Sequence, residues 1–163
     1  MRALVAVGAF LIVTMASCSE QGGPDPGNLL IRCPDATGAI SVSDGQVTLG
    51  GTPVRVAAVL GAPTASDEGL TFAIEVQGAS SPTTPSPSVQ CVRVRSTRES
   101  AQWDAVPRRI EETRDGSSAR VRATGRDGPH WRTGELVDVT VWLKIEASRH
   151  VVTLPCQPIR TIP

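Results

Sequence analysis

The sequence is poor in the residues that build aromatic cores. Among 163 residues it has no tyrosine, two phenylalanines and three tryptophans. One phenylalanine, Phe10, and both methionines lie within the first 15 residues. The core of a folded domain must therefore be built from valine, isoleucine, leucine and alanine. The length predicts one domain of ordinary size.

Histidine and lysine are almost as scarce. The two histidines, His130 and His150, each stand beside a predicted turn. No Gly-x-Ser-x-Gly elbow occurs, and a Ser-x-x-Lys motif is excluded because Val141 stands three residues before the single lysine, Lys144. We therefore expect both histidines to be exposed turn residues, no residue to be catalytic and the protein not to be an enzyme.

Metal-ligand spacings are also missing. Neither Cys-x-x-Cys nor His-x-x-x-His occurs in the chain. Cys33, Cys91 and Cys156 could surround copper or zinc with the histidines only if the fold gathered them. Copper-binding β-domains carry a histidine and a methionine shortly after a C-terminal cysteine, whereas Gln-Pro-Ile-Arg follows Cys156. We expect no metal and no cofactor.

The chain has no excess of charge of either sign, with 16 basic and 16 acidic residues. Without Arg2 the balance would be 15 against 16, or −1. A near-neutral chain is not a general polyanion binder, so no nucleic-acid partner is expected. Arginine is nevertheless concentrated in residues 93–132, which hold ten arginines against six acidic residues.

The N-terminal residues have the layout of an export signal. Arg2 precedes an uncharged apolar run over residues 3–15. That run is too short to span a bilayer, since a helix needs about 20 residues. Met15-Ala16-Ser17-Cys18 follows, and it resembles the lipobox of bacterial lipoproteins. The resemblance covers residues 1–18 and departs from the commonest pattern at Met15, where leucine is more usual.

The resemblance implies that residues 1–17 are removed and that Cys18 receives a diacylglyceryl group, whose two chains suffice for stable anchoring. The alternative is an ordinary secretory signal with an incidental cysteine. Residues 18–28 are rich in glycine and proline and predict a flexible tether. The expected location is the outer face of the cell membrane, or the outer membrane of a Gram-negative cell. The membrane is thus the first expected partner.

Alternation with a period of two dominates the rest of the chain. In the clearest example, residues 135–146, the opposite face is mostly polar but includes Trp142. Such a segment predicts a long strand with one face in the core. The core face carries five aliphatic residues: Val137, Val139, Val141, Leu143 and Ile145.

Shorter alternating segments and Asp-Gly turn signals recur along the chain. They predict an all-β domain over residues 29–163, an immunoglobulin-like or fibronectin-like antiparallel β-sandwich. The lack of tyrosine removes the tyrosine corner of that fold. We expect a hairpin over residues 107–124 and one short helix near residues 98–105. The Pro/Ser/Thr-rich residues 79–88 predict a long exposed loop, with an interdomain linker as the alternative and O-glycosylation compatible with either.

Three cysteines remain after Cys18, and an exported chain can form one disulfide among them. The period-two pattern places Cys33 and Cys156 on core-facing positions and Cys91 on an outward one. We therefore predict a Cys33–Cys156 disulfide with Cys91 left over. The alternative is Cys33–Cys91, because adjacent prolines could shift the local register.

Four arginines recur at every second position of two predicted strands, and would form a basic strip if those strands were neighbours. Such a strip could contact anionic headgroups or cell-wall polymers. The alternative is a solvated strand face, with the tryptophans covered by a second sheet or by residues 97–114. The candidate contact surface comprises Arg93, Arg95, Arg120, Arg122, Trp131 and Trp142.

These features predict a membrane-anchored envelope lipoprotein with a non-catalytic binding, scaffolding or assembly role. Its partner would be an envelope protein or polymer that the sequence does not identify. The alternative is an inhibitor or accessory subunit of an envelope hydrolase. An enzyme is the third interpretation, and it requires a deep pocket that gathers His130 or His150 with an acidic residue.

Overall fold

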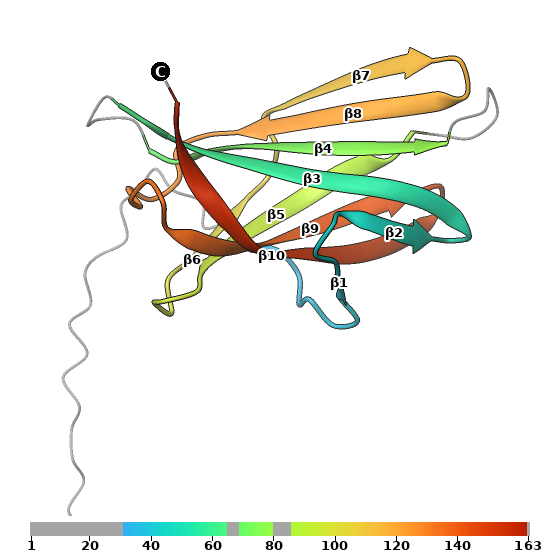
Figure 1. Cartoon of the computed structure of the whole chain (residues 1–163). Helices are drawn as coiled ribbons and strands as arrows, with labels where there is room; N and C mark the ends of the chain where they lie inside the picture. Colours follow the sequence, from blue (N-terminus) through green and yellow to red (C-terminus); the bar gives the residue numbers. More distant parts are fainter. Residues whose placement is uncertain (1–30, 65–68, 80–85, 163) are drawn as a thin grey trace, which may run out of the picture.

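The computed structural model describes residues 31–64, 69–79 and 86–162 (Figure 1). The predicted signal over residues 1–17, Cys18 and the tether over residues 18–28 lie outside the described residues, as does most of the predicted loop over 79–88. The described residues form strands and no helix, which confirms the all-β prediction. Those residues include no helix with the length and hydropathy needed to cross a membrane.

Ten strands form one continuous sheet. Their order is β6-β5-β9-β10-β3-β4-β8-β7, with β1 beside β10 and β2 beside β3. Strand β10 runs parallel to β1 and β3, whereas the other neighbours are antiparallel. The strands are β1 (Ile40–Ser41), β2 (Gln46–Leu49), β3 (Thr52–Pro63), β4 (Thr71–Ala79), β5 (Ser88–Ser96), β6 (Gln102–Ala105), β7 (Arg109–Asp115), β8 (Ser118–Gly125), β9 (Leu136–Ile145) and β10 (Ser148–Ile162).

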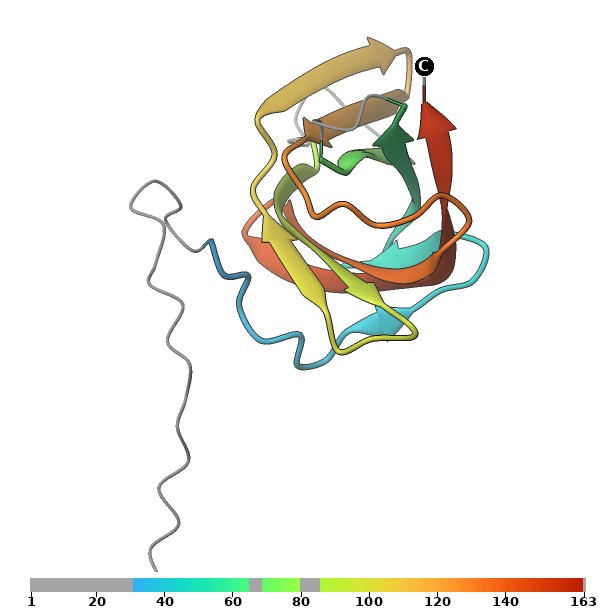
Figure 2. The same ribbon diagram turned by 90° about the vertical axis from the view of Figure 1, so that its left-hand side faces the viewer.

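This sheet curls into a half-barrel (Figure 2). Strand β10 joins its two halves, because its first part pairs with β9 and its residues from Ile159 onward pair with β3. A register shift between Leu154 and Gln157 marks a bulge, which bends a strand. The predicted immunoglobulin-like or fibronectin-like sandwich is therefore not the arrangement observed: one mixed sheet forms where two separate antiparallel sheets were expected.

The short helix expected near residues 98–105 is also wrong. Residues 97–100 form a bend, and β6 follows. The hydroxyl of Ser96 accepts hydrogen bonds from the N–H groups of Arg98 and Glu99, both at 3.2 Å. The Ser96 N–H in turn donates to the Ala101 carbonyl at 3.0 Å. Ser96 thus stabilises a tight turn between β5 and β6, and leaves no room for a helix.

The alternation predicted from sequence survives in the core. All five aliphatic residues of β9 that were expected to face inward are buried. They pack inside the curl with side chains of the other half of the sheet, including Phe72 and Ile74 from β4. The predicted hairpin is also confirmed, since β7 and β8 pair across Gly116, whose φ of 55° lies in the left-handed region that glycine tolerates.

The outer face of the sheet breaks the simple pattern at one place. Thr140 and Trp142 occupy outward positions of β9, yet both are buried. Cys91 is paired with Trp142 in the register of β5 against β9 and is buried as well. Something must therefore cover this part of the outer face, and it is the chain that precedes β1.

Candidate functional site

A disulfide fastens the first described residues to the outer face of the sheet. Cys33 and Cys91 are bonded, with their Cα atoms 5.7 Å apart, and together with Trp142 they form a small buried cluster. Ala36 and Val151 pack against this cluster. The predicted Cys33–Cys156 pair is therefore wrong, and the alternative pair is the one observed.

The prediction failed through its assumptions about Cys33 and Cys156. Cys91 does share the outward face of β5 with Arg93, as the alternation indicated. Cys33, however, precedes β1 in a segment without regular structure, so no strand phase applies to it. Cys156 lies within the bulge of β10 with φ of 54°, and it is exposed and unbonded. Its N–H donates to the Asp138 carboxylate at 3.0 Å.

An ion pair lies beside the disulfide and binds the same segment. Arg93 donates from Nε and Nη2 to the two carboxylate oxygens of Asp104, at 2.7 and 2.8 Å. The backbone of Cys33 completes the network, since its carbonyl accepts from Arg93 at 3.0 Å and its N–H donates to Asp104 at 2.8 Å. The guanidinium carbon also lies 5.2 Å from the centroid of the Trp142 ring. We call Cys33, Cys91, Arg93, Asp104 and Trp142 the N-terminal clasp.

The clasp holds its carboxylate in the charged form. Burial alone would raise the pKa of Asp104, whose side chain is only 5% exposed. Hydrogen bonds from Arg93 and from the Cys33 N–H outweigh that effect and lower the pKa below its ordinary value. Hydrogen bonding to Asp104 correspondingly raises the pKa of Arg93. The network therefore requires both charges to be present.

The predicted contact surface does not form as one patch. Arg93 and Arg95 lie on β5, whereas Arg120 and Arg122 lie on β8, and four strands separate β5 from β8 in the sheet. Arg120 is paired with Glu75 at 2.8 Å. The basic strip was conditional on neighbouring strands, and that condition is not met.

The two tryptophans of that predicted surface are also covered. Trp142 is buried in the clasp, and Trp131 is half-buried against the core. The expectation of exposed turn histidines holds for His130 only. His150 lies within β10 and is half-buried, and its Nε2 has no hydrogen-bond partner in the described part of the chain. The described residues contain no group of three or more histidine, cysteine or acidic side chains placed to hold a metal.

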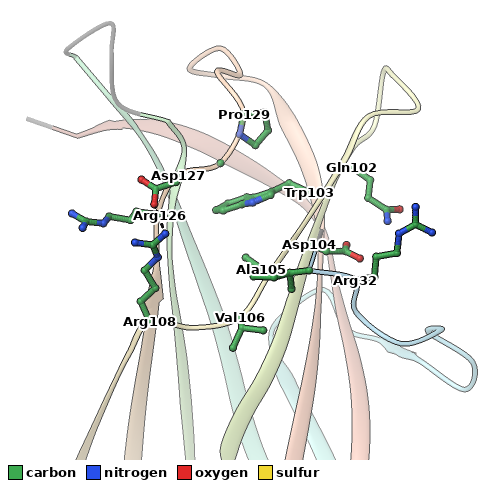
Figure 3. A pocket seen from close by; sticks show the side chains of 12 residues that line it. Arg32, Gln102, Trp103, Asp104, Ala105, Val106, Arg108, Arg126, Asp127 and Pro129 are labelled. Carbon is green, nitrogen blue, oxygen red and sulfur yellow. Dashed lines mark ion pairs between the residues drawn. The ribbon is translucent and has the colours of Figure 1, made fainter. Parts of the chain in front are cut away.

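A pocket of about 500 Å³ opens at the mouth of the half-barrel, beside the clasp (Figure 3). Strand β6 forms one wall, the connection from β6 to β7 contributes the floor in this view, and residues 126–129 form the opposite wall. Its lining contains no histidine, cysteine, serine or lysine. Twelve residues line it, among them three arginines, Arg32, Arg108 and Arg126, and the apolar side chains of Trp103 and Val106.

Trp103 is held rigidly in this pocket. Its ring lies 5.6 Å from that of Phe72, centroid to centroid, at 60°. On Gly128 a Cβ atom would lie 2.7 Å from the Trp103 ring, so glycine is required for the ring to pack on that backbone. The N–H of Gly128 donates to the Leu70 carbonyl at 2.9 Å, which ties residues 126–129 to the chain before β4.

The charges at the pocket rim are unevenly matched. Arg108 pairs with Asp127 at 2.5 Å, and both side chains are well exposed. In Figure 3 the Arg126 side chain starts beside Asp127 and extends away from this pair, while Arg32 lies on the far side of β6. Among the described residues, no carboxylate lies within ion-pair distance of Arg126 or Arg32. Asp104 also lines the pocket, but its charge is balanced by Arg93.

The pocket lining combines apolar, aromatic and charged side chains. The pocket offers an aromatic wall, exposed apolar side chains and arginines, and among the described residues it gathers neither histidine with a carboxylate, as the enzymatic interpretation required. Sequence reasoning missed Val106, Arg108 and Arg126, because they come from separate segments and share no motif. No protein-family model matches this chain, and no curated protein matches it either, so its function has to be argued from the site.

Proposed function

We propose that the protein is an exported lipoprotein whose β half-barrel serves as a non-catalytic binding module held at a membrane surface. The observation that carries this proposal is the N-terminal clasp. It fastens Cys33, which stands only fifteen residues after the expected lipid-bearing Cys18, to the middle strands of one half of the sheet.

The clasp suits a chain that is attached to a bilayer by its N-terminus. Fully extended at about 3.5 Å per residue, residues 19–32 reach roughly 50 Å, so the domain stays within that distance of the lipid. The disulfide would transmit a force applied at the lipid to β5. The ion pair of Arg93 with Asp104 would transmit it from β5 to β6. The domain would resist it as a unit, because both strands belong to the same continuous sheet.

The cysteine chemistry agrees with export. A structural disulfide persists in oxidising compartments and is rare in the reducing cytosol. Cys33 and Cys91 are both buried, which protects the bond from exchange with external thiols. The proposal thus joins two independent features, the lipobox-like sequence before Cys18 and a disulfide that follows shortly after it.

Replacing the anchoring residue tests the proposal. The full chain and Cys18→Ser are expressed in a bacterial host, and the cells are separated into membrane and soluble fractions. We expect the wild-type chain in the membrane fraction, and Cys18→Ser either released or retained with residues 1–17 uncleaved. Cys156→Ser is the matched control and should stay with the membrane as the wild type does. A Cys18→Ser chain that is cleaved and pellets with the membranes as fully as wild type would contradict the proposal.

A further inference from the structure

We propose that the pocket between β6 and residues 126–129 binds an amphiphilic acid: a ligand whose carboxylate or phosphate pairs with Arg126 and Arg108 while its apolar ring or chain packs on Trp103 and Val106. The proposal rests on the binding role given above, because it names the ligand class of that module. It does not depend on the lipid anchor and can fail separately from it.

The residues that line the pocket carry an excess of positive charge. Three arginines line the pocket, and the one carboxylate on the rim that is not engaged by Arg93 is Asp127. Arg126 lines the same rim, is exposed and has no carboxylate partner among the described residues; in Figure 3 its side chain starts beside Asp127 and extends away from the Arg108–Asp127 pair. Two guanidinium groups beside one carboxylate leave a positive charge that an acid group would neutralise, and guanidinium binds carboxylate and phosphate with two parallel hydrogen bonds.

The pocket also exposes apolar side chains beside its aromatic wall. Val106 is 48% exposed and Ile31 is 47% exposed, and both line this pocket beside Trp103. Single exposed aliphatic residues are ordinary, but two of them flanking an aromatic wall form a surface that gains from being covered. In Figure 3, Trp103 and Val106 lie between Arg108 on one side and Arg32 on the other, so a ring packed on them would keep its acid group at the rim.

The aromatic wall of the pocket is fixed in place, and the pocket has the volume of a small-molecule site. Trp103 is fixed by Phe72 and by the backbone at Gly128, so a ligand meets a wall that is already in place and loses little affinity to ordering it. A volume of about 500 Å³ lies within the range of small-molecule sites. It accommodates one ring or a short chain. The source of such an acid can be a free small molecule or an anionic lipid, and the test distinguishes the two.

The experiment follows the three indole N–H signals of the full-length protein by NMR in a neutral detergent. The probes are benzoate and phenyl phosphate, with benzamide as the neutral counterpart of benzoate. We expect both acids to shift the Trp103 indole signal with dissociation constants near ~1 mM, and benzamide to bind at least about tenfold more weakly. The Trp142 signal, from within the clasp, should not move.

Variants assign the two halves of the site. Arg126→Gln should weaken both acids about tenfold, because it removes a charge-assisted pair. Arg95→Gln, an exposed arginine on the outer face of β5, is the matched control and should leave binding unchanged. Val106→Ser should weaken phenyl phosphate while leaving the response to inorganic phosphate as it was. Equal binding of benzamide and benzoate, or full binding by Arg126→Gln, would overturn the proposal.

Two further experiments distinguish a soluble acid from an anionic lipid, and the binding site from the lipid anchor. Nanodiscs with phosphatidylglycerol are compared with nanodiscs of phosphatidylcholine. A Trp103 response to the anionic nanodiscs alone, with none to either soluble acid, would assign this face to a lipid surface and overturn the small-acid site. Cys18→Ser should bind benzoate as wild type does, and Arg126→Gln should still pellet with membranes. Failure of the site and failure of the anchor are thereby distinguishable.

Discussion

Two regions of the same sheet differ in how far their residues are exposed to solvent. On β5 and β9, two outward residues are sealed from solvent: Cys91 and Trp142 are each 6% exposed. On β7, all seven residues of the strand are exposed. The two regions belong to one continuous sheet, so strand pairing alone does not explain the contrast. The chain before β1 covers Cys91 and Trp142 on the outer face of β5 and β9, whereas β7 is the edge strand of the sheet and is exposed on both faces.

Their ion pairs differ in the same way. Arg93 and Asp104 are mostly buried and also bind the Cys33 backbone, whereas Arg114 and Glu112 pair at 2.5 Å on the exposed hairpin. An exposed pair adds little stability because water and salt screen it. A buried pair is costly to break, because the remaining charge loses its partner. The stability of the outer face is therefore concentrated where the chain before β1 is bound to β5 and β6.

Removing the disulfide should cause the largest loss in the free energy of unfolding. The chain-entropy relation gives about 4 kcal/mol for a bond that closes a loop of 58 residues. The Cys33→Ala/Cys91→Ala double variant should therefore lower the free energy of unfolding by roughly 3–4 kcal/mol, measured by denaturant unfolding. Cys156→Ala is the control and should change it by less than about 0.5 kcal/mol, since that residue is exposed. The reverse ranking would refute the observed pairing.

The second expected effect is that of Asp104→Asn. It leaves Arg93 without its charged partner and should cost roughly 2 kcal/mol at neutral pH. Because the folded pKa of Asp104 is lowered, its contribution is fully present above the ordinary aspartate pKa of about 3.9 and is lost as pH falls through the lower folded value. The difference between wild type and variant should thus shrink below about pH 4. A difference that stays constant from pH 7 to pH 2 would argue against the ion pair as its source.

The smallest effect is expected on the uncovered hairpin. Ile110 is 52% exposed on β7, and Ile110→Ser should change the free energy of unfolding by about 0.5 kcal/mol or less. Val94→Ser, at a fully buried position of β5, is the contrasting variant and should cost several times as much. Equal losses from the two would mean that β7 is covered in solution, which would erase the contrast between the regions.

Local patterns were sufficient to predict β9 and the hairpin of β7 and β8, but not β6, where a helix was expected. The alternation from Val137 to Ile145 and the Asp115-Gly116 turn are short-range signals, and both elements formed as expected. The curl of the sheet was not predictable in the same way. It depends on the bulge in β10, where Cys156 adopts a positive φ that a tally of apolar positions does not reveal.

The site was harder to predict for a related reason. Trp142 on a mostly polar face was a sign that something covers that face, but the cover is neither a second sheet nor residues 97–114, as the sequence interpretation had it. The segment that covers it, around Cys33, lies more than a hundred residues away and forms no strand, although its sequence alternates like one. Trp103, Arg108 and Arg126 likewise meet only through the fold. Long-range placement of that kind leaves no local spacing to recognise.

The central claim is that a lipid-bearing N-terminus leads directly into a disulfide-fastened domain, and a peptide map without reduction tests it. Protein purified from membranes is digested with trypsin and analysed by mass spectrometry. The account predicts an N-terminal peptide that begins at a diacylated Cys18, and a linked pair of peptides covering residues 33–55 and 56–93. An unmodified N-terminus, or a peptide around Cys33 linked to the one that contains Cys156, would contradict it.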